Sequence, residues 1–404
     1  MRRAAGSPGT SGFDVARARA ETPGCAHVVH LNNAGASLQP SPVLDAVFAH
    51  LRREADIGGY EAASEAAEDL EQPYTTGAGL LGCDPDELAV VESATRAWQS
   101  AFAAVPLGPG DRVLTSSTEY GSNYLQLLHT ARRRGASIQV VPDDETGQVS
   151  LDALARAIDG RVKLVAITHV AMGGGLVNPV AGVGQITRAA GVPFLLDACQ
   201  SLGQVPLDVD AIGCDFLTAT SRKFVRGPRG VGLLYARAAT TDHLVPALVD
   251  LRSATWASPD SYALEPGGRR FESFEISTAA KVGFGVALAY AGEWGLDAIW
   301  ARLRPLAERL RVGLAAIPGV EVVDRGATRG AIVTFTVAGW DPADVRSALR
   351  HAGVNVSVVE AATAHLDFDR RGIDAVVRAS VHYYNDEDDL ERCCRAVAAL
   401  LHRP

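Results

Sequence analysis

The sequence lacks the features that mark membrane-spanning, disulfide-linked and metal-binding proteins. No apolar run approaches the roughly 18 residues that a bilayer-spanning helix needs. The six cysteines form no CxxC pair, and the ten histidines form no HxH or HxxxH pair, so we expect no metal site. Cysteine usage of this kind is typical of a reducing compartment. We therefore expect a cytoplasmic protein that does not engage a membrane.

The chain also has fewer basic than acidic residues. The 404 residues carry a formal net charge of −9, which argues against nucleic acid as a partner because phosphate binding requires a basic face. With 47% hydrophobic and 21% charged residues, the chain has globular composition and is long enough for two domains. Two arginines near the N-terminus have no apolar stretch after them. The first dozen residues are therefore predicted to be a disordered tail, with no secretory signal.

Short apolar runs alternate with helical spacing between about residues 85 and 235. The predicted strands are 112–116, 163–170, 193–198, 215–220 and 230–236, and the predicted helices are 121–134, 150–159 and 180–190. Strands that are apolar on both faces and alternate with helices are typical of a buried, mainly parallel sheet. The expected fold class is therefore α/β.

Past residue 240 the pattern changes to that of a smaller α+β domain. A long helical stretch at 277–316 precedes strands at 331–337, 354–359 and 376–384 and helices at 345–353 and 386–402. We divide the chain into an N-terminal arm (1–30), a large domain (31–295) and a small C-terminal domain (296–404).

Lysine is scarce, with only three residues among 38 basic ones. Lys163 opens a strand and Lys281 lies in a helical stretch, so both are expected at the surface. Lys223 instead follows the carboxyl end of strand 215–220, where ligands bind in doubly wound sheets. Lysine forms Schiff bases and arginine does not. Lys223 therefore indicates imine chemistry, with a chance surface lysine as the alternative.

Asp197 ends an otherwise apolar strand, where a carboxylate is costly without a partner. A protonated pyridine nitrogen would be such a partner, and that pairing makes pyridoxal phosphate (PLP) an electron sink. Capping of the next helix is the alternative. Gln200, three residues on, could reach the same ligand or the solvent.

A phosphate would need a cradle of N–H groups and hydroxyls. Ser93 and Thr95 stand where an apolar strand turns into a helix, whose free N–H groups suit an anion. Thr220, Ser221 and Arg222 would add hydroxyls and a cation. A plain helix cap is the alternative for the first pair.

Arg378 is an unexpected cation in the strand-like VVRASV. Arginine binds a carboxylate with two parallel hydrogen bonds, which would orient an amino-acid substrate. A structural ion pair is the alternative.

The segments ESAT, EYGSN, THV, DACQ, SRKFVRGPRG, RFE and VRASVHYYN occur in this order. Together they resemble the class V aminotransferase family of fold-type I PLP enzymes. The resemblance runs from LNNAGAS (31–37) to the last helix. It implies a fold-type I architecture, PLP as cofactor and a homodimer with sites near the interface. Members include cysteine desulfurases, C–S lyases of ergothioneine synthesis and isopenicillin N epimerase-like enzymes.

The resemblance also implies residue roles. Lys223 would hold PLP and move the Cα proton, Asp197 would pair with the ring nitrogen, and Tyr120 would stack on the ring. The further cofactor contacts that it implies are Ala94, Thr95, Gln200, Thr220 and Arg222, and the implied substrate contacts are Arg378, Asn33 and Met172.

Two positions depart from the family pattern. Met172 stands where the family usually has a residue that hydrogen-bonds near the ring, so we expect a roomier, more apolar pocket there. Where desulfurases read RFEAGT this chain reads RFESFE. Glu275 would repel phosphate, so a contact with the partner's cofactor must differ.

The sequence favours β-elimination from an S-substituted L-cysteine, giving thiol, pyruvate and ammonia. Desulfurases need a mobile cysteine ahead of the final strand, and residues 356–374 contain none. Cys393 and Cys394 fall in the closing helix and Cys199 is interpreted as a packing residue. Persulfide transfer is therefore disfavoured.

Several other functions stay open at this point. They are decarboxylating oxidative deamination of a cysteine conjugate (as in lincosamide pathways), epimerisation, transamination, a catalytically inactive PLP-binding regulator, and a thiol hydrolase that uses Cys199 with His169.

Overall fold

The computed structural model describes residues 13–241 and 243–401. The disordered tail predicted for the first dozen residues lies outside this range. No described helix is long and apolar enough to cross a membrane.

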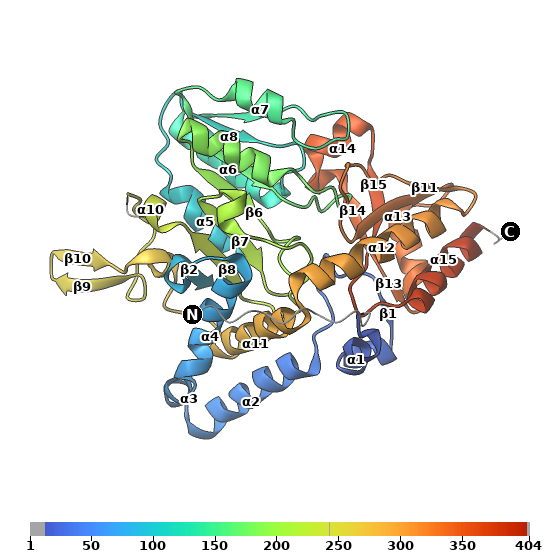
Figure 1. Ribbon diagram of the computed structural model, residues 1–404, viewed down its shortest axis with the longest axis horizontal. Helices are drawn as coiled ribbons and strands as arrows, with labels where there is room; N and C mark the ends of the chain where they lie inside the picture. The colour runs from blue at the N-terminus through green and yellow to red at the C-terminus, as the bar shows by residue number, and fades with distance from the viewer. Residues whose placement is uncertain (1–12, 242, 402–404) are drawn as a thin grey trace, which may run out of the picture.

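A seven-stranded sheet forms the centre of the large domain (Figure 1). Its order is β2-β8-β7-β6-β5-β3-β4, and β8 alone among these strands runs antiparallel to its neighbours. The strands are β2 Leu88–Val91, β3 Arg112–Thr115, β4 Ser137–Val140, β5 Val162–Thr168, β6 Phe194–Asp197, β7 Phe216–Thr220 and β8 Gly232–Ala236. The mainly parallel α/β sheet is confirmed; β4 was not among the strands predicted from the sequence.

Alternate residues of these strands face two different cores because side chains of a strand point to opposite faces. Leu88 and Val90 pack in one core with helices on one face, while Ala89 and Val91 pack in the other. The first core is covered by α2 Ser41–Ile57, α4 Ala67–Leu81, α7 Leu151–Ala157, α8 Val180–Ala190, α9 Val209–Ile212 and α11 Thr278–Trp294, and the second by α5 Ala94–Ala104 and α6 Gly121–Arg134.

A second, four-stranded antiparallel sheet is built from the C-terminal part of the chain. Its order is β11 Val320–Val322, β12 Ile332–Val337, β15 Ala375–Ser380 and β14 Ser357–Glu360. The helices α12 Leu296–Ala315, α13 Pro342–His351 and α15 Glu387–Leu401 pack on it in one hydrophobic core. The smaller α+β unit predicted from the sequence is thus present.

Two details of this unit differ from the sequence prediction. The helical stretch 277–316 is two helices, because Gly295 adopts φ +77° between α11 and α12. The predicted strand 354–359 is split into β13 Val354–Asn355 and β14. The proposed domain division at 295/296 falls on this glycine and stays a proposal.

The N-terminal segment packs against the C-terminal unit. The short strand β1 Val29–His30 pairs with β13, and α1 Val15–Ala20 contributes Ala18 to the same core. Arg19 forms ion pairs with Asp386 and Asp389. The described part of the predicted arm is therefore ordered helix and strand.

The remaining short elements lie at the edges. They are α3 Gly59–Glu65, α10 Ala238–Thr241, α14 His365–Arg371, the hairpin strands β9 Ala254–Ser258 and β10 Ser261–Leu264, and four short 3₁₀ turns, η1 Pro23–Ala26, η2 Pro85–Glu87, η3 Gly267–Phe271 and η4 Ala361–Thr363. In Figure 1 the β9–β10 hairpin projects from the left of the large sheet.

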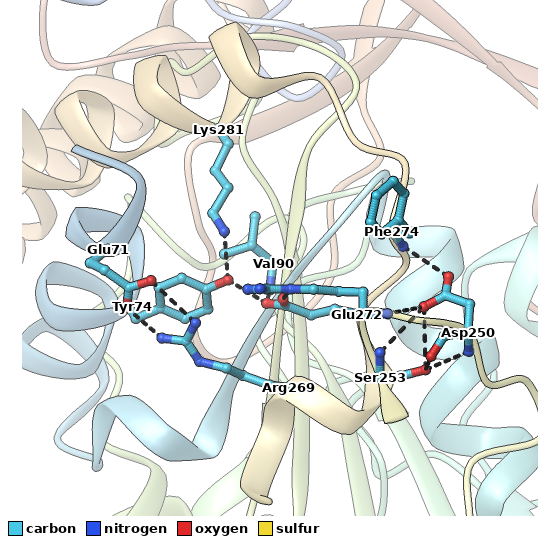
Figure 2. A network of polar contacts seen from close by, with 10 residues as sticks. Glu71, Tyr74, Val90, Asp250, Ser253, Arg269, Glu272, Phe274 and Lys281 are labelled. Atoms are coloured by element: carbon cyan, nitrogen blue, oxygen red, sulfur yellow. Dashed lines mark hydrogen bonds and ion pairs between the residues drawn. The ribbon is translucent and has the colours of Figure 1, made fainter. Parts of the chain in front are cut away.

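Lys281 is not at the surface, contrary to the sequence prediction. Its side chain is buried on α11, and its Nζ donates to Tyr74 Oη at 2.7 Å. Tyr74 in turn donates to Glu272, which also accepts from the N–H of Val90 and pairs with Arg252 (Figure 2). The network joins α4, β2 and α11 to the segment that carries the RFE motif.

Candidate active site

One pocket opens at the carboxyl ends of the parallel strands, and it gathers most of the residues predicted from the sequence. Its lining comes from the ends of β5, β6 and β7 and from the starts of α5 and α6, because the parallel strands end on one edge. Among its lining residues are Ala94, Thr95, Tyr120, Met172, Asp197, Gln200, Thr220, Arg222 and Lys223. The topology thus assembles segments that are far apart in the sequence.

Lys223 enters this pocket from the loop that follows β7. Its Nζ lies 5.9 Å from the centroid of the Tyr120 ring. Burial lowers the pKa of Lys223 below its usual value. In the described residues no hydrogen bond or ion pair of the ammonium is found, so the amine is left for a ligand.

Asp197 is held rigidly at the end of β6. Its Oδ2 accepts from Asn123 Nδ2 at 2.8 Å and its Oδ1 accepts from the N–H of Cys199 at 2.8 Å. The alternative of capping the next helix is not borne out, because a turn follows Asp197 and the next helix, α9, begins at Val209 with Asp208 as its cap. Neither contact neutralises the charge, so a cationic ring nitrogen remains a fitting partner.

Gln200 has an unsatisfied oxygen. Its Nε2 donates to the carbonyl of Ala34 at 3.1 Å, while its Oε1 is buried without a partner in the part of the chain that the structure describes. A buried orphan acceptor is costly unless a ligand satisfies it. The hydroxyl of a pyridoxal ring is a donor of the right kind.

The residues predicted to hold a phosphate lie together at the start of α5. Ser93 caps this helix by accepting from the N–H of Arg96, which leaves the first N–H groups of α5 free. Arg222 donates to Thr220 Oγ1 at 3.0 Å beside it. A Cβ on Gly232 would lie 2.6 Å from the nitrogen of Ala94, so only glycine lets β8 pass beneath this turn.

Arg378 lies next to this pocket and not in its lining. It is buried on β15, where its Nη1 donates to the carbonyl of Met172 at 3.3 Å and its Nε has no partner among the described residues. Burial lowers the pKa of Arg378 to about 10. The structural ion pair weighed as an alternative is not found in the described ranges, which leaves the guanidinium for a carboxylate.

Asn33 does not reach the pocket. Its side chain is fully buried, with Nδ2 donating to the carbonyl of Ser380 and Oδ1 accepting from Tyr384. The predicted substrate contact of Asn33 therefore finds no support, because its amide joins the N-terminal segment to the end of β15.

Asn123 was quoted within EYGSN but given no role. It lines the pocket and holds Asp197. The spacing in the sequence could have indicated this role, because a residue three positions after Tyr120 lies one helical turn into α6 and on the same side.

The thiol hydrolase alternative lacks its geometry. No hydrogen bond joins Cys199 and His169 within residues 13–241 and 243–401. Burial raises the pKa of the Cys199 thiol well above its usual range and lowers the pKa of His169 to about 4. Neither the thiolate nor a paired base is present. A search of the described residues finds no group of three His, Cys, Asp or Glu that could hold a metal ion.

Comparison with known proteins decides the family. The model of the aminotransferase class V family matches residues 29–393. The chain belongs to the class V aminotransferases. PLP is the cofactor of this family, and the orphan Gln200 oxygen, the Asp197 carboxylate and the helix start at Ala94 fit it. The fold is fold-type I.

The relatives fall into two kinds. The chain is 29% identical over 371 residues to the probable cysteine desulfurase of Methanothermobacter thermautotrophicus, covering 90% of this chain and 92% of that one. It is 33% identical over 405 residues to the probable hercynylcysteine sulfoxide lyase of Mycobacterium tuberculosis, covering 99% and 96%. The solved apo structure of a cysteine desulfurase from Thermococcus onnurineus superposes with a TM-score of 0.89 at 25% identity, covering 95% and 97%.

Proposed function

We propose that this class V enzyme is a C–S lyase that cleaves an S-substituted L-cysteine to a thiol, pyruvate and ammonia. The proposal is supported by where the cysteines lie in the chain. Cys199 is the only cysteine in the pocket lining of the described chain, and desolvation raises the pKa of its thiol well above the usual range. Residues 356–374, which form β14 and α14, contain no cysteine. A sulfur acceptor for the desulfurase reaction is therefore missing.

The similarity to the lyase named above supports the same function. That relative is named a sulfoxide lyase acting on a cysteine derivative, and it matches this chain almost end to end. The elimination breaks the Cα–H and Cβ–S bonds of the substrate. Sulfur leaves with the bonding electrons and is protonated, and water hydrolyses the remaining amino acrylate to pyruvate and ammonia.

Three residues in or next to the pocket would act in this reaction. PLP, when bound, supplies an electron sink for the pair left on Cα. Lys223 would hold the cofactor and would take the Cα proton as general base. Arg378 would bind the substrate carboxylate through two N–H donors. Tyr120, whose ring centroid lies 5.9 Å from Lys223 Nζ, would stack on the cofactor ring.

Met172 would help to receive the group on sulfur. Its side chain packs against the apolar cluster of Val359, Phe368 and Val376 from the C-terminal unit. Gly175, with φ +68°, is pressed so closely on that unit that a Cβ would lie 2.4 Å from the carbonyl oxygen of Ile332. An apolar wall of this kind favours S-substituents with apolar surface.

The protein is also proposed to be a homodimer. Exposed apolar side chains gather in the segment before the β9–β10 hairpin and in the one after it, at Val245, Leu248, Val249, Leu251 and Phe274. Exposed clusters of this kind mark association surfaces. Light scattering behind a sizing column tests the dimer directly.

The reaction itself is tested by incubating the PLP-loaded enzyme with a panel of S-substituted L-cysteines and their sulfoxides. We expect pyruvate equimolar with thiol from the S-substituted cysteines and equimolar with sulfenic acid from their sulfoxides, with no gas exchange. CO2 release with oxygen uptake and an intact C–S bond would instead establish decarboxylating oxidative deamination. Racemised substrate would establish epimerisation.

A further inference from the structure

Glu119 is a buried carboxylate that the proposed reaction does not use. It is 6% exposed and stands between β3 and α6. Its Oε1 accepts from the N–H of Tyr120 at 2.9 Å, from Asn123 Nδ2 at 2.9 Å and from Thr168 Oγ1 at 2.8 Å. Its Oε2 accepts from Thr115 Oγ1 at 3.0 Å. Three of these four donor residues line the pocket.

A single amide joins Glu119 to the cofactor's partner. Asn123 Nδ2 donates to Glu119 Oε1 at 2.9 Å and to Asp197 Oδ2 at 2.8 Å. An amide nitrogen has two hydrogens, one for each carboxylate. Neither carboxylate has an ion pair with a cation of the chain in the ranges that the structure describes. The carboxylates of Glu119 and Asp197, both negative when ionised, thus lie on either side of the Asn123 amide.

The surroundings of Glu119 change its pKa. Burial, followed by the negative charge of Asp197, raises the pKa of Glu119 to about 7. All four donors suit the ionised carboxylate, which accepts at both oxygens. The repulsion between the two carboxylates is relieved when a cation pairs with either of them.

We propose that Glu119 is a positioning residue that acts through Asn123 and strengthens the hold of Asp197 on the protonated ring nitrogen of PLP. A proton on that nitrogen lies between Asp197 and the ring, and the charge of Glu119 makes its retention more favourable. The proposal rests on PLP as the cofactor and is independent of the bond that the enzyme goes on to break.

The variant Glu119→Gln separates charge from position. The Gln oxygen can accept from Tyr120, Asn123 and Thr168, and the Gln nitrogen can donate to Thr115 Oγ1. The full-length protein is stripped of PLP with hydroxylamine and reloaded with PLP or with its 1-deaza analogue, in which carbon replaces the ring nitrogen. Equilibrium titration gives two dissociation constants and their ratio, the preference for PLP.

We expect Glu119→Gln to lower this preference about tenfold, the change that corresponds to one pKa unit. The matched control is Thr115→Val, which removes one hydroxyl next to Glu119 and leaves the carboxyl group in place, and it should leave the ratio within about twofold. An unchanged ratio in Glu119→Gln, or an equal change in both variants, would overturn the proposal. Failure of the parent protein to bind PLP would overturn the cofactor assignment together with it.

Discussion

Lys281 is buried and Lys223 is half-buried, and the two differ in whether the described residues give them a partner. Lys281 donates to Tyr74, which donates to Glu272 and has Arg269 over its ring (Figure 2). Arg252 pairs with the same Glu272. Lys223 lies at a pocket with no protein partner found in the described residues. Burial lowers the pKa of both. A buried cation with partners holds the fold together, whereas one left without partners is prepared for a ligand.

The largest expected effect separates the two lysines by function. Lys223→Ala should abolish the visible absorbance of bound cofactor and lower the rate of thiol release by about 10³-fold, because the general base is lost. Lys281→Met should keep the absorbance and the rate of thiol release within about threefold of the parent protein. Absorbance spectra and thiol assays of the two variants check this. Equal losses in the two variants would contradict the different functions assigned to Lys223 and Lys281.

The next largest effect is expected on stability, when the Lys281 network loses its carboxylate. Glu272→Gln leaves Lys281 and Arg252 without their carboxylate, so we expect the free energy of unfolding to fall by about 3 kcal/mol. Glu275→Gln, at an exposed position three residues away, is the matched control and should change stability by less than about 0.5 kcal/mol. Urea unfolding at pH 7 measures both.

A smaller effect is the pH dependence that Lys281 imposes. Burial lowers the pKa of Lys281 to about 8 in the folded state, below the unfolded value of about 10.4. Between these values the unfolded chain binds more protons, so stability should rise with pH, by up to about 2 kcal/mol from pH 8 to 10. Above pH 10 the raised pKa of Tyr74 opposes the rise. Lys281→Met should flatten the increase in urea unfolding from pH 8 to 10; an identical slope would contradict the assignment.

The smallest effect is expected at the pocket cysteine. Cys199→Ala removes a protonated thiol that packs beside Asp197, so the rate of thiol release should stay within about twofold of the parent. A loss of 100-fold or more, measured with the same substrates, would revive persulfide transfer through Cys199 and weaken the lyase proposal.

Much of the active site could be predicted because it follows from local patterns. Lys223, Asp197 and Thr220 each come at the carboxyl end of a strand whose apolar run is plain in the sequence, and parallel strands bring such ends to one edge. Thr95 was predicted at the start of a helix for the same kind of local reason. The structure places all four in one pocket.

Two residues lie elsewhere than their local sequence suggests, because their partners come from distant segments. Asn33 stands in a motif that resembles the family's, yet its amide is taken up by Ser380 and Tyr384, about 350 residues away. Lys281 has the helical context of a surface residue, but Tyr74 and Glu272 enclose it. No local pattern distinguishes such positions from exposed ones.

The sequence by itself determined the alternation of strands and helices in the large domain and the lysine at the end of a strand. These depend on side-chain periodicity and backbone preference over a few residues. Only the tertiary structure decided which charges are buried and which of them are neutralised. Burial and pairing are sums over contacts from remote segments, so Glu119, Asn123 and Lys281 acquire their roles only when the chain has folded.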